Sequence, residues 1–292
     1  MKLDLIWQSI RLNLRLHLAH PLGYAALGLL VFWAASVPSV GINRADFAAR
    51  ASELGYPPLS DSALAGLGAA QVASGFMTAC GVLLFLNNLE RERGIGLDEV
   101  LASTPVPSWV LIVLQYLGNT ATLALCTLIA YLVALVAYPF RELEGFSVLE
   151  FFWPGLLFPL GSVFLLASLP LVLDGFRVYQ IGRGIAYGIL VLLFNLGPFI
   201  VAAATYVDHP LHPMFQVWLT ANQGLDTVGI WYVRGYLSLV LEAIEQLGTP
   251  DIPVSLWWGM VLRPRLVTIG VGLGLAACAA WRFDRFRPSP RG

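Results

Sequence analysis

Six long runs of apolar residues restrict the possible fold more than any other feature of the sequence. They lie at about 22–42, 65–87, 109–138, 152–173, 184–206 and 258–281. An α-helix rises about 1.5 Å per residue, so each run can cross roughly 30 Å of hydrocarbon. Only 12% of the 292 residues are charged, against about a quarter in a soluble domain. The sequence therefore predicts an all-α membrane protein with six transmembrane helices in a single domain, 1–292.

The last run has two possible starts. Arg263-Pro264-Arg265 interrupts its apolar character, so the part in the hydrocarbon could begin at Leu266. Trp257 and Trp258 would then lie in the interfacial belt, where tryptophan is enriched.

Residues 2–20 form two faces when drawn as a helix. The apolar face is made by Leu3, Ile6, Trp7, Ile10 and Leu14. The opposite face carries Asp4, Gln8, Arg11 and Arg15. This pattern predicts an amphipathic helix lying in the membrane interface; docking on a partner protein is the alternative. The first apolar run follows this segment and lacks a small-residue cleavage site, so we expect no cleavable signal peptide.

The cationic residues predict the orientation. With six spans both termini share one side, and placing them in the cytoplasm puts eleven of the 17 cationic residues inside and six outside. Cytoplasmic loops carry the excess of Lys and Arg. The sequence therefore predicts a multi-pass protein of the cell membrane with both termini cytoplasmic.

Several kinds of chemistry lack their residues. The only lysine is Lys2, so the phosphate-binding loop of an ATPase cannot form here. No Gly-x-Ser-x-Gly elbow is present, and no run has an ionisable residue at its middle, as an ion-coupled carrier needs. His209 and His212 flank a short proline-bounded turn, which we interpret as a structural loop rather than a metal site. Net charge is near zero, which argues against nucleic acid. We predict no enzyme activity and no bound cofactor.

Polar residues inside the runs allow two interpretations. The residues concerned are Gln71, Gln115, Asn119 and Asn195. Gln115 and Asn119 are four residues apart and share one helix face. Such side chains could line a substrate path, or they could hold helices together by hydrogen bonds.

The loop after the second run is the strongest local feature. Its charged exit from the membrane is followed by two glycines and a short helix, 97–102, which Thr104-Pro105 terminates. Acidic residues in the first turn favour that helix through its dipole. The residues that would contact a cytoplasmic partner are Glu90, Arg91, Glu92, Arg93, Leu97, Asp98, Glu99, Val100, Leu101, Thr104 and Pro105.

In these parts and their order the chain resembles the type-2 ABC exporter permeases. The resemblance rests on the interfacial N-terminal helix, the Glu-Arg-Glu-Arg-Gly exit, the Ser103-Thr104-Pro105-Val106 stop, a helical segment within 207–256 before the last span, and the basic aromatic tail at 281–286. Gly94-Ile95-Gly96 and Gln115 depart from the family pattern, in which Gly-Thr and an early lysine are common.

The resemblance implies a mechanism. Two permeases, either two copies of this chain or this chain and a sister, would pair in the lipid membrane above two ABC ATPase subunits, which would bind ATP and Mg. Helix 97–102 would be the coupling helix, and the permease itself would perform no covalent chemistry. The alternatives are a membrane-embedded lipid-modifying enzyme and a non-transporting sensor or assembly factor.

Overall fold

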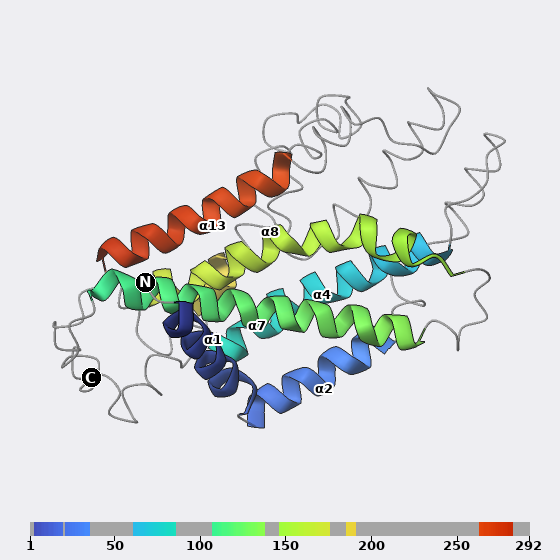
Figure 1. Ribbon diagram of the computed structural model, residues 1–292, viewed down its shortest axis with the longest axis horizontal. Coiled ribbons are helices and arrows are strands. Elements are labelled where there is room, and N and C mark those ends of the chain that lie inside the picture. The colour runs from blue at the N-terminus through green and yellow to red at the C-terminus, as the bar shows by residue number, and fades with distance from the viewer. Residues whose placement is uncertain are drawn as a thin grey trace.

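The computed structural model describes residues 3–19, 21–35, 61–85, 107–137, 146–175, 185–190 and 263–282. These residues form a bundle of helices with no strand among them, which confirms the all-α prediction for the described part of the chain. The labelled helices are α1 Leu3–Leu18, α2 Pro21–Ala35, α4 Asp61–Phe85, α7 Ser108–Ala137, α8 Val148–Gly175 and α13 Arg263–Arg282 (Figure 1).

Two of the described helices are long and apolar enough to cross a membrane. They are Trp109–Ala137 in α7 and Arg265–Arg282 in α13. The pair Ile6–Leu18 and Gly23–Ala35 passes the same test together, with a bend of 82° between its halves. Pro159–Leu173, within α8, is a shorter apolar helical stretch. The chain is therefore a membrane protein.

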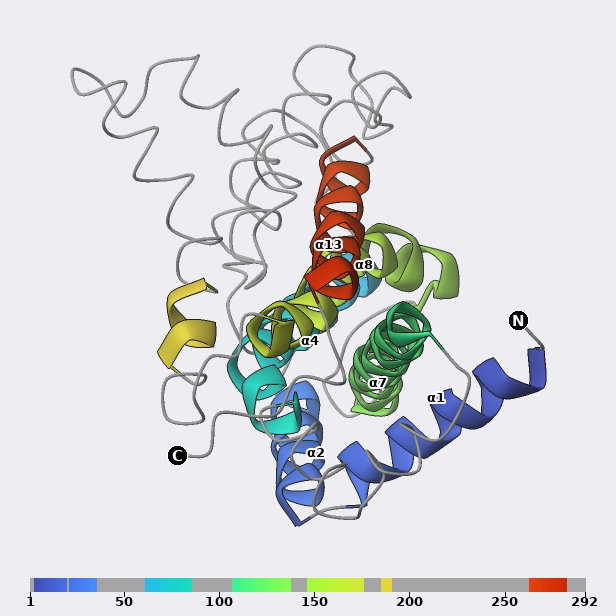
Figure 2. The same ribbon diagram turned by 90° about the vertical axis from the view of Figure 1, so that its left-hand side faces the viewer.

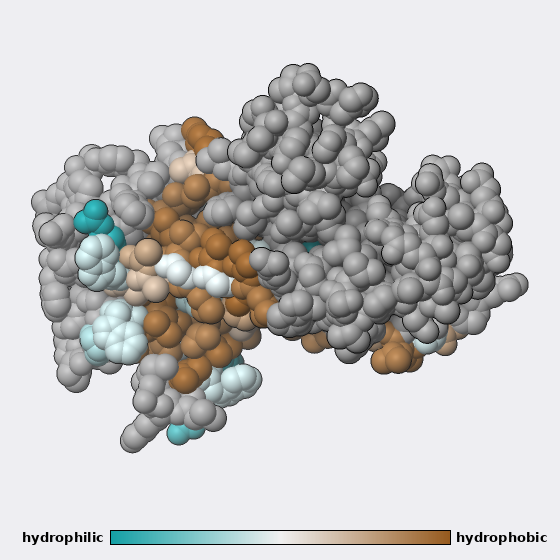
Figure 3. Space-filling model, turned by 90° about the horizontal axis from the view of Figure 1, so that it is seen from above, coloured by the Kyte–Doolittle hydropathy of each residue, from teal (hydrophilic) through white to brown (hydrophobic). Residues whose placement is uncertain are grey.

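Exposed apolar side chains along α7 agree with a lipid environment. Leu128, Leu132 and Val136 follow one another at one-turn spacing and are 48%, 47% and 67% exposed. A soluble protein rarely leaves so continuous an apolar stripe in water. Viewed from above, apolar side chains dominate the described surface, and hydrophilic ones gather at one end (Figure 3).

The bend between α1 and α2 has a local cause. Pro21 has no backbone N–H, and in a continuous helix its ring would clash with the carbonyl of His17. The α1 ladder accordingly ends with the N–H of Ala19, which donates to the carbonyl of Arg15 at 2.9 Å. Gly23 then passes so close to the His17 carbonyl that a Cβ would collide with it. Proline breaks the helix and glycine lets the second half turn sharply away.

The helices run in two opposite directions. α4 and α8 are parallel, since Ser147 N–H donates to Ser62 Oγ at 3.0 Å and Gly66 packs on Phe151 one turn later. α13 runs the same way as α8, because Gly161 faces Thr268 and, farther along, Gly272 faces Phe164. α2 and α7 run the other way (Figure 1).

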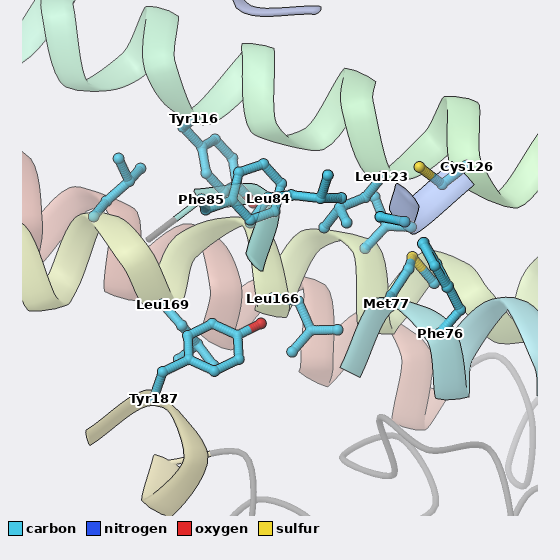
Figure 4. Packing of buried hydrophobic residues seen from close by; sticks show 14 of the residues in the cluster. Phe76, Met77, Leu84, Phe85, Tyr116, Leu123, Cys126, Leu166, Leu169 and Tyr187 are labelled. Atoms are coloured by element: carbon cyan, nitrogen blue, oxygen red, sulfur yellow. The ribbon is translucent and has the colours of Figure 1, made fainter. Parts of the chain in front are cut away.

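The core lies among α2, α4, α7, α8 and α13. Figure 4 shows Phe76 and Met77 of α4, Leu123 and Cys126 of α7, and Leu166 of α8 converging there. At the far end of α7, the rings of Tyr131 and Phe151 meet edge to face with centroids 5.8 Å apart. Lipid tails are as apolar as these side chains, so exclusion from water does not drive helices together within a membrane. Close packing of this kind holds them together instead.

Candidate functional site

The predicted ATPase-coupling residues, 90–105, lie outside the described residues. The structure does describe the helices on either side of them. α4 ends at Phe85 and α7 begins at Ser108, so the contacts at these two ends determine what the loop is attached to.

The four predicted path residues have different outcomes. Gln115 and Asn119 are buried on α7, with 7% and 0% of their surface exposed. Gln71 lies on α4, but its side chain is not among those described, and Asn195 lies outside the described residues. The structure thus gives side-chain surroundings for two of the four.

Asn119 joins two helices directly. Its Nδ2 donates to the carbonyl of Ala167 on α8 at 3.2 Å. One turn earlier, the hydroxyl of Tyr116 donates to the carbonyl of Phe164, also at 3.2 Å. These two bonds connect α7 to the backbone of α8, as the helix-joining interpretation of the polar residues expects. Asn119 Oδ1 is buried without a hydrogen-bond partner.

A second polar contact, which the sequence did not predict, joins α1 to α7. His17 Nδ1 lies 3.0 Å from Thr122 Oγ1, and the Thr122 hydroxyl donates to the carbonyl of Gly118 at 2.9 Å. A hydroxyl has one proton to give. When that proton is directed at Gly118, Nδ1 of His17 is the donor in the His17–Thr122 bond.

Asn13 fits a notch in α7 one turn from that bond. A Cβ at Gly118 would lie 2.6 Å from both Cβ and Cγ of Asn13, so only glycine admits this side chain. Asn13 Nδ2 donates to the carbonyl of Ser9 at 3.1 Å, while its Oδ1 is buried without a partner. Two successive turns of α1 therefore contact two successive turns of α7.

The end of α4 meets the same place. The ring of Phe85 packs edge to face against His17, with centroids 4.9 Å apart. We call Asn13, His17, Phe85, Gly118 and Thr122 the α1 junction. It ties Phe85, the last residue of α4, to both α1 and α7.

The apolar face predicted for α1 differs in part from the face that packs. Asp4, Gln8, Arg11 and Arg15 are exposed, as expected. Trp7, however, is 65% exposed, while Asn13 and His17 are 6% and 1% exposed. The helix is rotated so that these two polar side chains reach their partners on α7. The sequence held one signal for this contact between α1 and α7. Asn13 and His17 are four residues apart, and so are Gly118 and Thr122.

The α1 junction connects α1, α4 and α7 through a hydrogen bond, a close contact at glycine and a ring contact. Among the described residues, no three His, Cys, Asp or Glu side chains come together to hold a metal ion. Comparison with protein-family models and with curated proteins finds no match.

Proposed function

We propose that this chain is the membrane subunit of an ATP-binding cassette exporter, driven by separate ATPase subunits. One observation carries the proposal: the coupling-type sequence, which begins at Glu90, follows five residues after Phe85, whose ring contacts His17 of α1. A partner that moves the 97–102 helix would then act on three helices at once. The permease performs no covalent chemistry and binds no nucleotide.

The arrangement of helix ends supports the proposed orientation. The end of α4, the start of α7 and the ends of α8 and α13 lie toward the end of the bundle where α1 crosses it (Figure 1). Arg11, Arg15 and Arg282 belong to this end, and all are exposed. The positive-inside rule makes it the cytoplasmic side.

The direction of α13 supports an even number of spans. Because α8 and α13 run the same way, the chain between them has to return to the opposite end. The apolar run 184–206 is the proposed return, and it would be the fifth of six spans. The 82° bend fits an interfacial α1 followed by a first span that starts at α2.

Force would travel from the loop into the bundle by short, directional contacts. Movement of α4 at Phe85 would displace His17, and His17 would move Thr122 and α7 through their 3.0 Å hydrogen bond. α7 is bonded in turn to α8 through Asn119. Packed helices have discrete arrangements, so a small displacement at one end can switch the whole group.

The substrate path belongs to this switch. Gln115 and Asn119 are buried in the described arrangement. They can line a path only when α7 and α8 separate, which breaks the bond from Asn119 to Ala167. Breaking an interhelical bond of this kind costs about 0.6 kcal/mol on average, which the driving ATPases can readily supply.

The test is recovery of an ATPase with the tagged chain from native membranes. We expect a protein with Walker and signature motifs to co-purify, and Glu90→Lys or Glu99→Lys to reduce its recovery and its stimulated ATP hydrolysis. Asp61→Lys is the matched control, because Asp61 starts α4 at the opposite end and should leave both unchanged. The proposal would be contradicted if no ATPase partner were recovered and both loop variants left ATP hydrolysis unchanged.

A further inference from the structure

The outer face of α1 carries an unusual combination of side chains. Arg11 and Arg15 are exposed one turn apart. Among the described residues neither has an ion-pair partner. Like charges at this spacing destabilise a helix slightly, so the pair is more stable with an anion close by.

Apolar side chains flank this cationic pair on both sides. Trp7 is 65% exposed and lies one turn before Arg11; Leu12 is 45% exposed and lies on the other side of the polar band. A purely aqueous surface would gain nothing from an exposed tryptophan. At a headgroup layer, an indole and a leucine enter the boundary with the acyl chains while arginines remain at phosphate depth.

The rest of α1 is fixed in place. Asn13 and His17 hold its inner side against α7 through the α1 junction. The outer side lies at the periphery of the bundle, turned away from α7 (Figure 2). The helix therefore presents its arginines in a set orientation toward whatever surrounds the protein at this depth.

We infer that α1 is a binding surface for anionic phospholipid headgroups, with Arg11 and Arg15 as the phosphate contacts and Trp7 and Leu12 as the apolar anchors. Charge complementarity and the flanking anchors favour a lipid surface over an acidic protein, which would need no exposed tryptophan beside the cations. Because the headgroups hold α1 and α1 holds α7 through His17–Thr122, lipid composition acts on the bundle itself. This inference does not depend on an ATPase.

The experiment uses quenching of Trp7 by brominated lipids in liposomes of the full-length chain. Phosphatidylglycerol and phosphatidylcholine are brominated in turn at equal total bromine. The chain has nine tryptophans, so the difference between wild type and Trp7→Phe isolates Trp7. Each cation near an anionic surface contributes about fivefold. We expect brominated phosphatidylglycerol to be preferred by between about fivefold and twenty-five-fold, and less so in 1 M salt, where screening is stronger.

Three variants give the result its meaning. Arg11→Gln/Arg15→Gln should reduce the preference to near one, Arg11→Lys/Arg15→Lys should retain most of it, and Arg282→Gln, an exposed arginine on α13, should leave it unchanged. Size-exclusion chromatography and circular dichroism check that each variant is folded. Equal quenching by the two lipids in wild type would overturn the inference, and so would a preference that survives the double glutamine variant. If these arginines bound an acidic protein instead of lipid, the two lipids would quench wild-type Trp7 equally.

Discussion

The α1 junction and the α8–α13 contact join helices by opposite means. At the α1 junction, His17 and Thr122 share a directional hydrogen bond, and Asn13 fits against Gly118. At the α8–α13 contact, Gly272 lies so close to the backbone of Phe164 that no side chain fits between them. The first contact includes a directional bond between two side chains, whereas the second brings two helix backbones close together at a glycine.

This difference assigns different roles to the two contacts. Close backbone packing at glycine maximises van der Waals contact, which is the main source of helix association in lipid. Hydrogen bonds contribute less there, but they fix which residues face each other. We therefore regard the α8–α13 contact as the stable scaffold and the α1 junction as the movable connection.

Gly272→Leu should have the largest effect. A Cβ at this position would lie 2.6 Å from the Phe164 carbonyl oxygen and 3.0 Å from the Leu165 nitrogen, so α13 would have to move away from α8. Overpacking of this severity costs about 3 kcal/mol or more. We expect loss of the monodisperse peak in size-exclusion chromatography in detergent.

Gly270→Leu is the matched control for that change. Gly270 is on the same helix, two residues earlier, with no atom within 4 Å of a Cβ built there. It should retain the wild-type elution profile. If the two variants behaved alike, the α8–α13 contact would not be the scaffold.

The next largest effect concerns the α1 junction. His17→Ala and Thr122→Val each remove one partner of the 3.0 Å bond. In a double-mutant cycle on thermal stability, we expect a coupling energy of about 1 kcal/mol, since a buried hydrogen bond is worth about 0.5–1.5 kcal/mol. Thr122→Ser keeps the hydroxyl and should keep the coupling. Additive single effects would show that the bond does not connect α1 to α7.

The sequence predicted the ends of a single helix better than the contacts between helices. Prolines bracket the apolar run of α7 at Pro107 and Pro139, so the expected span 109–138 and the observed helix Ser108–Ala137 differ by a residue at each end. The length of an apolar run and the position of a helix-breaking proline are local properties, so a single sequence is enough to identify them. The number of spans stays a prediction, since two of the described helices meet the length and apolarity test.

The α1 junction could not be derived in the same way. His17 and Thr122 are 105 residues apart, and the apolar pattern of α1 favoured the face with Trp7. Asn119 was recognised as a polar residue that needs a partner, but that partner is the backbone carbonyl of Ala167. Every residue has such a carbonyl, so no side-chain pattern identifies the one that is used.

Asn119 tests the boundary between the two kinds of contact. It lies between α7 and α8 and makes a directional bond across them. Asn119→Leu should lower the free energy of unfolding by about 0.6 kcal/mol, the average for an interhelical bond in a membrane. The control is Thr120→Val, whose hydroxyl bonds only to its own helix at Tyr116. A loss as large as that from Gly272→Leu would make Asn119 part of the scaffold.

Tyr187 should show the smallest effect, and of opposite sign. Its hydroxyl is buried without a hydrogen-bond partner, and it faces α4 at Gly81, where a Cβ would lie 2.9 Å away. A buried hydroxyl with no partner carries an uncompensated desolvation cost, so Tyr187→Phe should leave thermal stability unchanged or raise it slightly. Tyr116→Phe is the informative counterpart, because that hydroxyl donates to Phe164 and its removal should be destabilising. If Tyr187→Phe were the more damaging of the two, the Tyr187 hydroxyl would have a partner in the folded protein. The 185–190 segment would then be held to α4 by a directional bond, as α1 is held to α7, rather than by packing.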